Sequence, residues 1–237
     1  MIVSIFTRFF LVFFMLFLAG CASNSTDPEI AFRGQSPSQI YQTGRQAFLK
    51  RDDAAAIKAY EALNVLYPMS LYSQSALLDL MTSYQRQGDA ANTEKTAEHF
   101  IRFYSDSSSL DYAYYMIALA HLNQDRGWYL RHIPMDSTQR DPGTMRQAYS
   151  DFKNFIQKFP NSPYYADAQR RLRYLRSVFS QYELHIADFY FRKQSYVAAA
   201  NRAADIIHQY PETPAAKTAH HILHESYRAL NVSVLEE

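Results

Sequence analysis

From Ser38 onward, apolar and small residues recur at helical spacing, and short polar stretches interrupt them. Three polar triplets have the composition of turns between helices: Arg51-Asp52-Asp53, Gln87-Gly88-Asp89 and Lys193-Gln194-Ser195. No Gly or Pro occurs between Tyr164 and Tyr210, which predicts one helix of about 29 residues before the last of these turns. The pattern predicts helices at about 38–50, 53–66, 70–86, 90–104, 109–125, 143–159, 163–192, 196–209 and 214–230.

A repeated spacing of small residues relates these helices to one another. An alanine precedes a proline by 12 residues in three places: Ala56 and Pro68, Ala148 and Pro160, Ala199 and Pro211. Before Pro68, Gly44 and Tyr60 also stand at the positions typical of a tetratricopeptide repeat, where small residues let two antiparallel helices cross closely. The fold class predicted is all-α, a tetratricopeptide-repeat α-solenoid of about five helical-hairpin repeats, the last incomplete, with a concave groove.

The repeats define the expected domain organisation. They span about 38–68, 69–106, 107–160, 161–211 and 212–237, so that one repeat domain covers 38–237. Before it, an apolar segment with one positive charge ends in Leu18-Ala19-Gly20-Cys21, which matches the lipobox of bacterial lipoproteins. We expect residues 1–20 to be a signal peptide, Cys21 to carry lipid and residues 21–37 to be a flexible tether. The chain would be held to the membrane by lipid alone.

Composition argues against most enzyme classes. The net charge of +1 gives no reason to expect nucleic acid as a partner. There is no Gly-rich phosphate loop and no nucleophile elbow, and the single Cys is the one in the lipobox. His220 and His224 stand one helical turn apart without a third ligand in view, and Glu225-Ser226 has no catalytic domain after it. We therefore expect no enzyme activity, no cofactor and no metal site.

Two features leave alternatives open. The basic cluster of Arg170, Arg171, Arg173 and Arg176 could be a solvated flank of the long helix or a docking surface for an acidic partner. The segment 126–142 interrupts the third repeat and contains Trp128, the only Trp. A segment of this length with large apolar residues either packs back on the domain or binds a partner.

Several blocks of the sequence, in order, resemble the BamD family of outer-membrane β-barrel assembly lipoproteins. The resemblance covers nearly all of 21–230 and is carried by IYQTGRQAFLKRD, ALNVLYP, YSQSALLDL, HFIRFY, LDYAYYM, QRDP, YSDFKNFIQKFPNSPYYADA, VAAANR and QYPETPAA. It implies a non-enzymatic scaffold on the periplasmic face of the outer membrane. The expected partners are the periplasmic domains of the barrel subunit, accessory assembly lipoproteins and unfolded outer-membrane proteins.

The resemblance also implies where partners bind. The family's Asn-Arg in the second helix of repeat 4 matches Asn201-Arg202, and that arginine is linked to docking of the barrel subunit; a guanidinium suits this role because it can hold a carboxylate through two hydrogen bonds. For the groove of the first repeats, which would recognise incoming barrel proteins, the candidates are Tyr41, Tyr72, Gln74 and Tyr84. The alternative from another class is a lipoprotein adaptor that recruits cell-wall enzymes or proteases.

Overall fold

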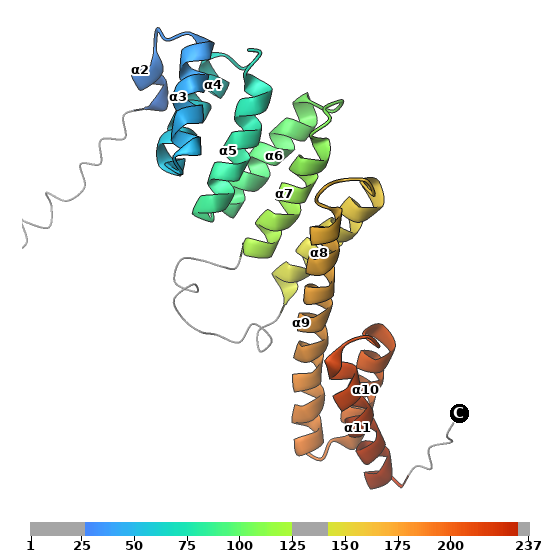
Figure 1. Ribbon diagram of the computed structural model, residues 1–237. Helices are drawn as coiled ribbons and strands as arrows, with labels where there is room; N and C mark the ends of the chain where they lie inside the picture. Colours follow the sequence, from blue (N-terminus) through green and yellow to red (C-terminus); the bar gives the residue numbers. More distant parts are fainter. Residues whose placement is uncertain (1–26, 125–141, 232–237) are drawn as a thin grey trace, which may run out of the picture.

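The computed structural model describes residues 27–124 and 142–231, which form a curved row of helices (Figure 1). The helices are α2 (Pro28–Phe32), α3 (Pro37–Leu49), α4 (Asp53–Leu66), α5 (Ser73–Gln87), α6 (Ala90–Phe103), α7 (Leu110–Asn123), α8 (Gly143–Lys158), α9 (Tyr165–Arg192), α10 (Tyr196–Gln209) and α11 (Pro214–Ala229). Every predicted helix is present, and no end differs from its prediction by more than three residues. The all-α prediction is confirmed, since the described residues contain no strand.

The predicted turns end and restart helices as expected. The carboxylates of Asp52 and Asp89 accept the backbone N–H groups of Ala55 and Asn92 and so cap the first turns of α4 and α6. Immediately before each cap the chain adopts a left-handed conformation, with φ of 63° at Arg51 and 77° at Gly88. The same conformation recurs at Gln194 before α10, with φ of 61°. The three triplets are therefore structurally equivalent turns within repeats.

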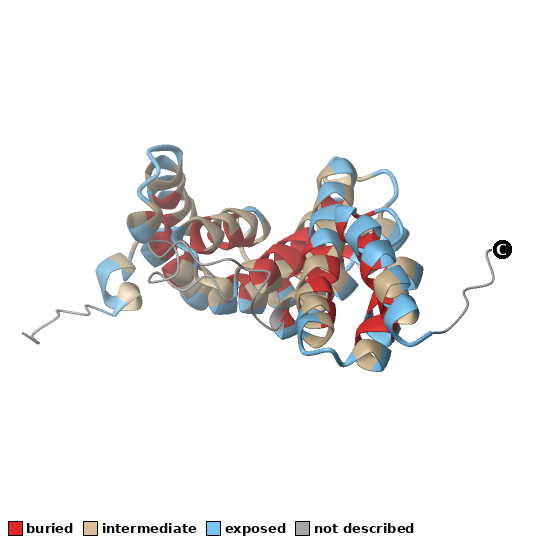
Figure 2. Ribbon diagram, turned by 90° about the horizontal axis from the view of Figure 1, so that it is seen from below, coloured by how far each residue is buried: buried red, intermediate tan, exposed pale blue. Residues whose placement is uncertain are grey.

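The small residues of the repeat signature lie where helices cross. A Cβ atom at Gly44 would stand 2.6 Å from a ring carbon of Tyr60, which is fully buried, so this position of α3 accepts only glycine. Ala56, Ala148 and Ala199 are all fully buried as well. Buried residues follow the faces that the helices turn toward one another (Figure 2). The spacing thus identified the helix crossings that hold each repeat together.

The long helix α9 joins two separate cores. One core runs from Ile40 to Phe179 and includes buried residues of α3 to α8 and the first half of α9. The other starts at Leu184 and includes the second half of α9, α10 and α11 up to Ile222. We call the first group, with α2, the N-terminal body and the second the C-terminal body. Helix α8 and helix α10 both pack on α9, one nearer each end (Figure 1).

The structure departs from the expected tether in one place. Residues 28–32 form helix α2, which packs against α4, so this part of the 21–37 segment is not a free tether. The helix begins because Pro28 favours a first helical turn and the Asp27 carboxylate accepts the N–H of Glu29. The signal peptide, Cys21 and Trp128 lie outside the described residues. Among the described residues, no helix is both long and apolar enough to cross a membrane.

Candidate functional sites

Two of the four predicted groove residues are in direct contact. The rings of Tyr41 on α3 and Tyr72 before α5 are stacked, with centroids 5.1 Å apart and planes 24° apart. Tyr41 also lies against Tyr60, with centroids 6.1 Å apart. The turn that places Tyr72 is fixed by the Ser73 hydroxyl, which donates to the carbonyl of Tyr67 at 2.9 Å. This explains why α5 begins three residues later than predicted.

The same turn exposes two large apolar side chains. Met69 is 88% exposed and Leu71 is 96% exposed, the highest values among large apolar residues of the described chain. Two residues after Tyr72, the Gln74 amide donates to the hydroxyl of Ser107 at 2.7 Å and so links this turn to the next one between repeats. Tyr41, Tyr72 and Gln74 therefore lie beside an exposed apolar turn, as a binding surface requires.

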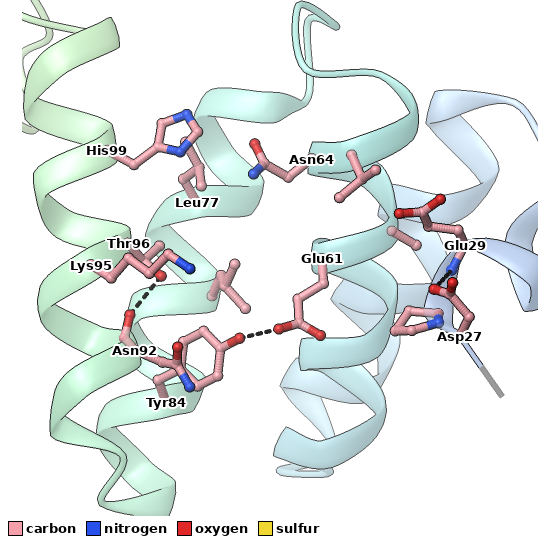
Figure 3. Close-up of a pocket in the computed structure, with 14 residues that line it drawn as sticks. Asp27, Glu29, Glu61, Asn64, Leu77, Tyr84, Asn92, Lys95, Thr96 and His99 are labelled. Atoms are coloured by element: carbon pink, nitrogen blue, oxygen red, sulfur yellow. Dashed lines mark hydrogen bonds between the residues drawn. The ribbon is translucent and has the colours of Figure 1, made fainter. Parts of the chain in front are cut away.

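Tyr84 lies in a different place, almost three helical turns further along α5. Its ring is 6% exposed, and its hydroxyl donates to the carboxylate of Glu61 on α4 (Figure 3). Burial raises the pKa of Tyr84, and the hydrogen bond to Glu61 raises it further, so the phenol stays neutral. The structure thus does not bring Tyr84 together with the other three predicted residues.

Tyr84 forms part of the wall of a cavity of about 300 Å³ between α4, α5 and α6, which α2 borders at one side (Figure 3). Leu77 and Leu80 provide apolar surface, and Glu61, Lys95 and His99 add polar groups. Burial, and secondarily the charge of Arg102, lower the pKa of His99, which favours its neutral form. The cavity combines apolar and polar walls and suits part of an amphipathic peptide. Sequence reasoning missed Glu61, Lys95 and His99 because nothing in the local pattern marks them.

Asn201 and Arg202 are both exposed on α10. A guanidinium nitrogen of Arg202 lies 3.1 Å from a carboxylate oxygen of Glu183 on α9, while 45% of the Arg202 side chain is exposed. A guanidinium has five N–H groups, so this ion pair leaves donors free for a second carboxylate. Arg202 is therefore both held in position by α9 and open to a partner.

Three of the four arginines in the basic cluster on α9 form ion pairs within the chain. Neither a solvated flank nor a docking surface, the two alternatives from the sequence, includes this role. Arg170 and Arg171 both pair with Asp167, which also accepts the hydroxyl of Tyr115 on α7. Burial alone would raise the pKa of Asp167, but the hydrogen bonds from Tyr115 and the two arginines outweigh it and lower that pKa to about 2. Arg173 is exposed.

Arg176 connects the two bodies. Its guanidinium pairs with Glu212 after α10, donates to the carbonyl of Gln209 and lies 5.2 Å from the ring centre of Tyr210. Glu212 and Gln209 are more than 30 residues away in sequence, so no local pattern could reveal this role. The arginine cluster therefore acts mainly as a set of internal ion pairs, with little left as a docking surface.

The histidine-rich end of the chain has no arrangement typical of catalysis or metal binding. His220, His221 and His224 are exposed on α11, and no group of three or more metal-ligating side chains occurs in the described residues. Glu225 pairs with Arg228 at 3.0 Å, and Ser226 is fully buried. The Glu225-Ser226 pair thus does not face a substrate cleft.

The chain matches the outer membrane lipoprotein family (YfiO) over residues 33–237. It is 36% identical to the outer membrane protein assembly factor BamD of Vibrio cholerae, over 91% of this chain and 88% of that protein. The BamD proteins of Pasteurella multocida and Haemophilus influenzae are 31% and 30% identical, over 92% and 91% of this chain and 83% and 81% of their own lengths. The adaptor alternative finds no support among these relatives.

Two solved tetratricopeptide repeat proteins are similar in structure. One is from Parabacteroides merdae, with a TM-score of 0.40 and 16% identity over 84% of this chain and 65% of that one. The other is from Thermus thermophilus, with a TM-score of 0.40 and 15% identity over 83% of this chain and 100% of that one. The fold assignment rests on the helix pairs described above and not on these likenesses. By its sequence, the chain belongs to the BamD family of outer membrane protein assembly factors, which are non-enzymatic scaffold proteins.

Proposed function

We propose that the chain is a lipid-anchored scaffold subunit of the outer-membrane β-barrel assembly machinery. In this proposal the N-terminal body binds incoming outer-membrane proteins and the C-terminal body binds the periplasmic domains of the barrel subunit. The observation that carries the proposal is the exposed turn of Met69 and Leu71 beside the stacked Tyr41 and Tyr72, because a folded monomer gains nothing from displaying such apolar surface. Unfolded barrel proteins offer apolar and aromatic residues that would cover it.

The lipid anchor belongs to the same proposal. Signal-peptide removal after residue 20 would leave Cys21 as the lipidated N-terminus, with residues 22–26 before the capped helix α2. The chain would then lie on the periplasmic face of the outer membrane, where accessory assembly lipoproteins can also reach it. A Cys21→Ala variant should fractionate as a soluble protein with unchanged helical circular dichroism. A variant that stays in the membrane would contradict the anchor.

Arg202 provides the test of docking to the barrel subunit. Arg202→Glu should abolish co-purification of that subunit from detergent-solubilised outer membranes, because a carboxylate repels the acidic group that the guanidinium would hold. Arg228→Glu, which alters another exposed arginine with one ion pair, is the matched control. Unchanged co-purification of the Arg202 variant would overturn the docking assignment.

A second variant distinguishes loss of the contact with the partner from loss of the local structure around Arg202. Glu183→Gln removes the same intramolecular ion pair but keeps the guanidinium of Arg202. We expect it to retain the barrel subunit. If Glu183→Gln releases the subunit as completely as Arg202→Glu does, the ion pair matters for folding of α10 and Arg202 makes no contact with the partner.

For the N-terminal body, Leu71→Asp should weaken binding of an unfolded outer-membrane protein in a pull-down with the full-length scaffold. The exposure of this side chain means that the substitution leaves the fold intact. Exposed Val197 on α10 provides the control position, as Val197→Asp. Equal binding by the Leu71 and Val197 variants would contradict the assignment of client binding to this turn.

A further inference from the structure

Residues of α8, the middle of α9 and the end of α10 enclose a gap. Tyr149 in the first half of α8 lies against Phe179 at the middle of α9, with ring centroids 5.8 Å apart. Tyr210 at the end of α10 lies against Arg176, one turn earlier on α9. The first half of α8 and the end of α10 therefore approach the same part of α9 from opposite ends (Figure 1). Between them is a cavity of about 440 Å³.

Aromatic rings and cations from all three helices line this gap. Phe179 on α9, Tyr149 on α8 and Tyr210 after α10 provide the rings. Arg146 on α8 lies over the Phe179 ring, 5.5 Å from its centre. Arg176 lies over the Tyr210 ring, and His208 stands at the exposed end of α10. A gap of this kind offers apolar walls and positive charge together.

The two arginines differ in what balances their charge. Arg176 is paired with Glu212. Arg146 is exposed, and no described carboxylate lies within ion-pair distance of its guanidinium. Its position over an aromatic ring limits its rotamers, so it loses little further freedom when it binds an anion. Of the two arginines in this gap, Arg146 is therefore the one whose guanidinium can bind a carboxylate of a partner.

We propose that the gap between α8 and α10 receives a loop of the docked partner that presents an Asp or Glu beside an apolar side chain. Arg146 would hold the carboxylate, and the rings of Tyr149, Phe179 and Tyr210 would cover the apolar neighbour. The inference rests on the proposed function, because it specifies a contact of the barrel subunit with these repeats. It differs from the contact of Arg202, which lies about two turns earlier on α10 and has its own carboxylate, Glu183.

Site-specific photocrosslinking tests the proposal in the full-length, membrane-anchored protein. A benzoylphenylalanine in place of His208 would report on the gap, and one in place of His220 on α11 would serve as the control position. We expect the barrel subunit to be crosslinked at position 208 and not at 220, through a peptide that contains Asp or Glu. A crosslink to lipid, or to a peptide without a carboxylate, would overturn the proposal.

Charge variants then test the role of Arg146. Arg146→Gln should lower the yield of the crosslink at position 208 about tenfold, as loss of one charge-assisted hydrogen bond predicts. Arg173→Gln changes an exposed arginine outside the gap and should leave the yield unchanged. In addition, Arg146→Glu should be rescued when the crosslinked Asp or Glu of the partner is changed to Arg. Equal yields with and without Arg146, or a failed rescue, would overturn the proposal.

The outcomes separate this inference from the function on which it rests. If Arg202→Glu releases the barrel subunit while Arg146→Gln leaves the crosslink intact, the docking function stands and the carboxylate contact is wrong. If the Arg146-dependent crosslink joins position 208 to a protein outside the assembly machinery, the proposed function fails. The inference, which places the barrel subunit in the gap, then fails with it.

Discussion

The N-terminal and C-terminal bodies follow the same repeat but have cores of different composition. Seven aromatic residues occur among the buried residues of the N-terminal core, whereas six of the nine buried residues of the C-terminal core are alanine and none is aromatic. Alanine lets helices approach closely, but each alanine removes little apolar surface from water. We infer that the C-terminal body is the less stable one and relies more on its attachment to α9.

The comparison suggests a division between rigidity and adaptation. The N-terminal body has a large aromatic core and a fixed apolar turn, so the surface that we propose for client binding is formed before a client arrives. The C-terminal body has a smaller core, and segments with few buried apolar contacts open locally at low free-energy cost. Docking of a partner on α10 would supply the stabilisation that its own core lacks.

The largest effect is expected from Phe152→Ala on α8. Phe152 is fully buried and its ring lies 6.1 Å from that of Tyr115, so truncation should lower the free energy of unfolding by about 3–5 kcal/mol. Chemical denaturation gives the loss, and hydrogen exchange by mass spectrometry should locate it in the N-terminal body. Ile206→Ala is the matched truncation in the C-terminal core and should accelerate exchange in α10 and α11 alone. Exchange spread evenly over both bodies in each variant would contradict the division into two cores.

The sequence predicted the helices of both bodies because their signals are local. Two of the three turn triplets carry their own capping aspartate, and Gly44 and Tyr60 mark a helix crossing within one hairpin. The division into two cores can be predicted from the sequence only in part. The length of α9 was predicted from the absence of Gly and Pro, but the separation of the cores also depends on which side chains are buried at its middle.

The candidate sites were harder to predict because they depend on contacts between distant residues. Tyr84 was grouped with Tyr41, although the side on which it leaves α5 points it to Glu61. The partner of Arg176 is 36 residues away, and the gap beside Arg146 exists only because α8 and α10 meet at α9. A sequence motif can identify a functional residue, but tertiary packing determines which side chains that residue contacts.

The second prediction concerns a histidine of the N-terminal body that lies between two carboxylates. His121 on α7 lies 2.6 Å from Asp151 on α8 and 3.0 Å from Glu94 on α6. Burial alone would lower its pKa, but the hydrogen bonds and charges of Asp151 and Glu94 outweigh it and raise the pKa above 6.5. A raised folded-state pKa contributes stability that is fully present below pH 6.5 and is lost as pH rises through the folded-state value.

Wild-type stability should therefore fall across this pH window, and His121→Gln should remove that dependence. At pH 6 the variant should be about 1–3 kcal/mol less stable, because two half-buried carboxylates lose a cationic partner. Urea denaturation at several pH values measures this, with exposed His221→Gln as the control. Stability that rises with pH in the wild type but not in His121→Gln would show that the carboxylates do not hold the charged ring.

The third prediction weakens the joint between the bodies. Arg176→Gln removes the ion pair with Glu212 and the cation over Tyr210. Because half of the Glu212 side chain is exposed, we expect a loss of only about 1 kcal/mol. Hydrogen exchange should become faster in α10 and α11 and stay unchanged in α4 to α6. Arg170→Gln, an exposed pair within one helix, is the control, and an equal effect of both variants would argue against a special joint.

The smallest effect is expected from the turn that begins α10. Gln194 has a left-handed conformation with φ of 61°, and Gly88 has the equivalent conformation in the N-terminal body at no steric cost. Gln194→Gly should therefore stabilise the C-terminal body by about 0.5–1 kcal/mol, because it relieves the clash of Cβ with the backbone. The reciprocal Gly88→Gln should destabilise the N-terminal body by a similar amount. Thermal unfolding with segment-resolved hydrogen exchange measures both changes. Opposite signs at the two turns are required, since glycine adopts the left-handed conformation without the Cβ clash that glutamine has. A loss of stability in Gln194→Gly would show that the left-handed conformation before α10 carries no steric cost for glutamine.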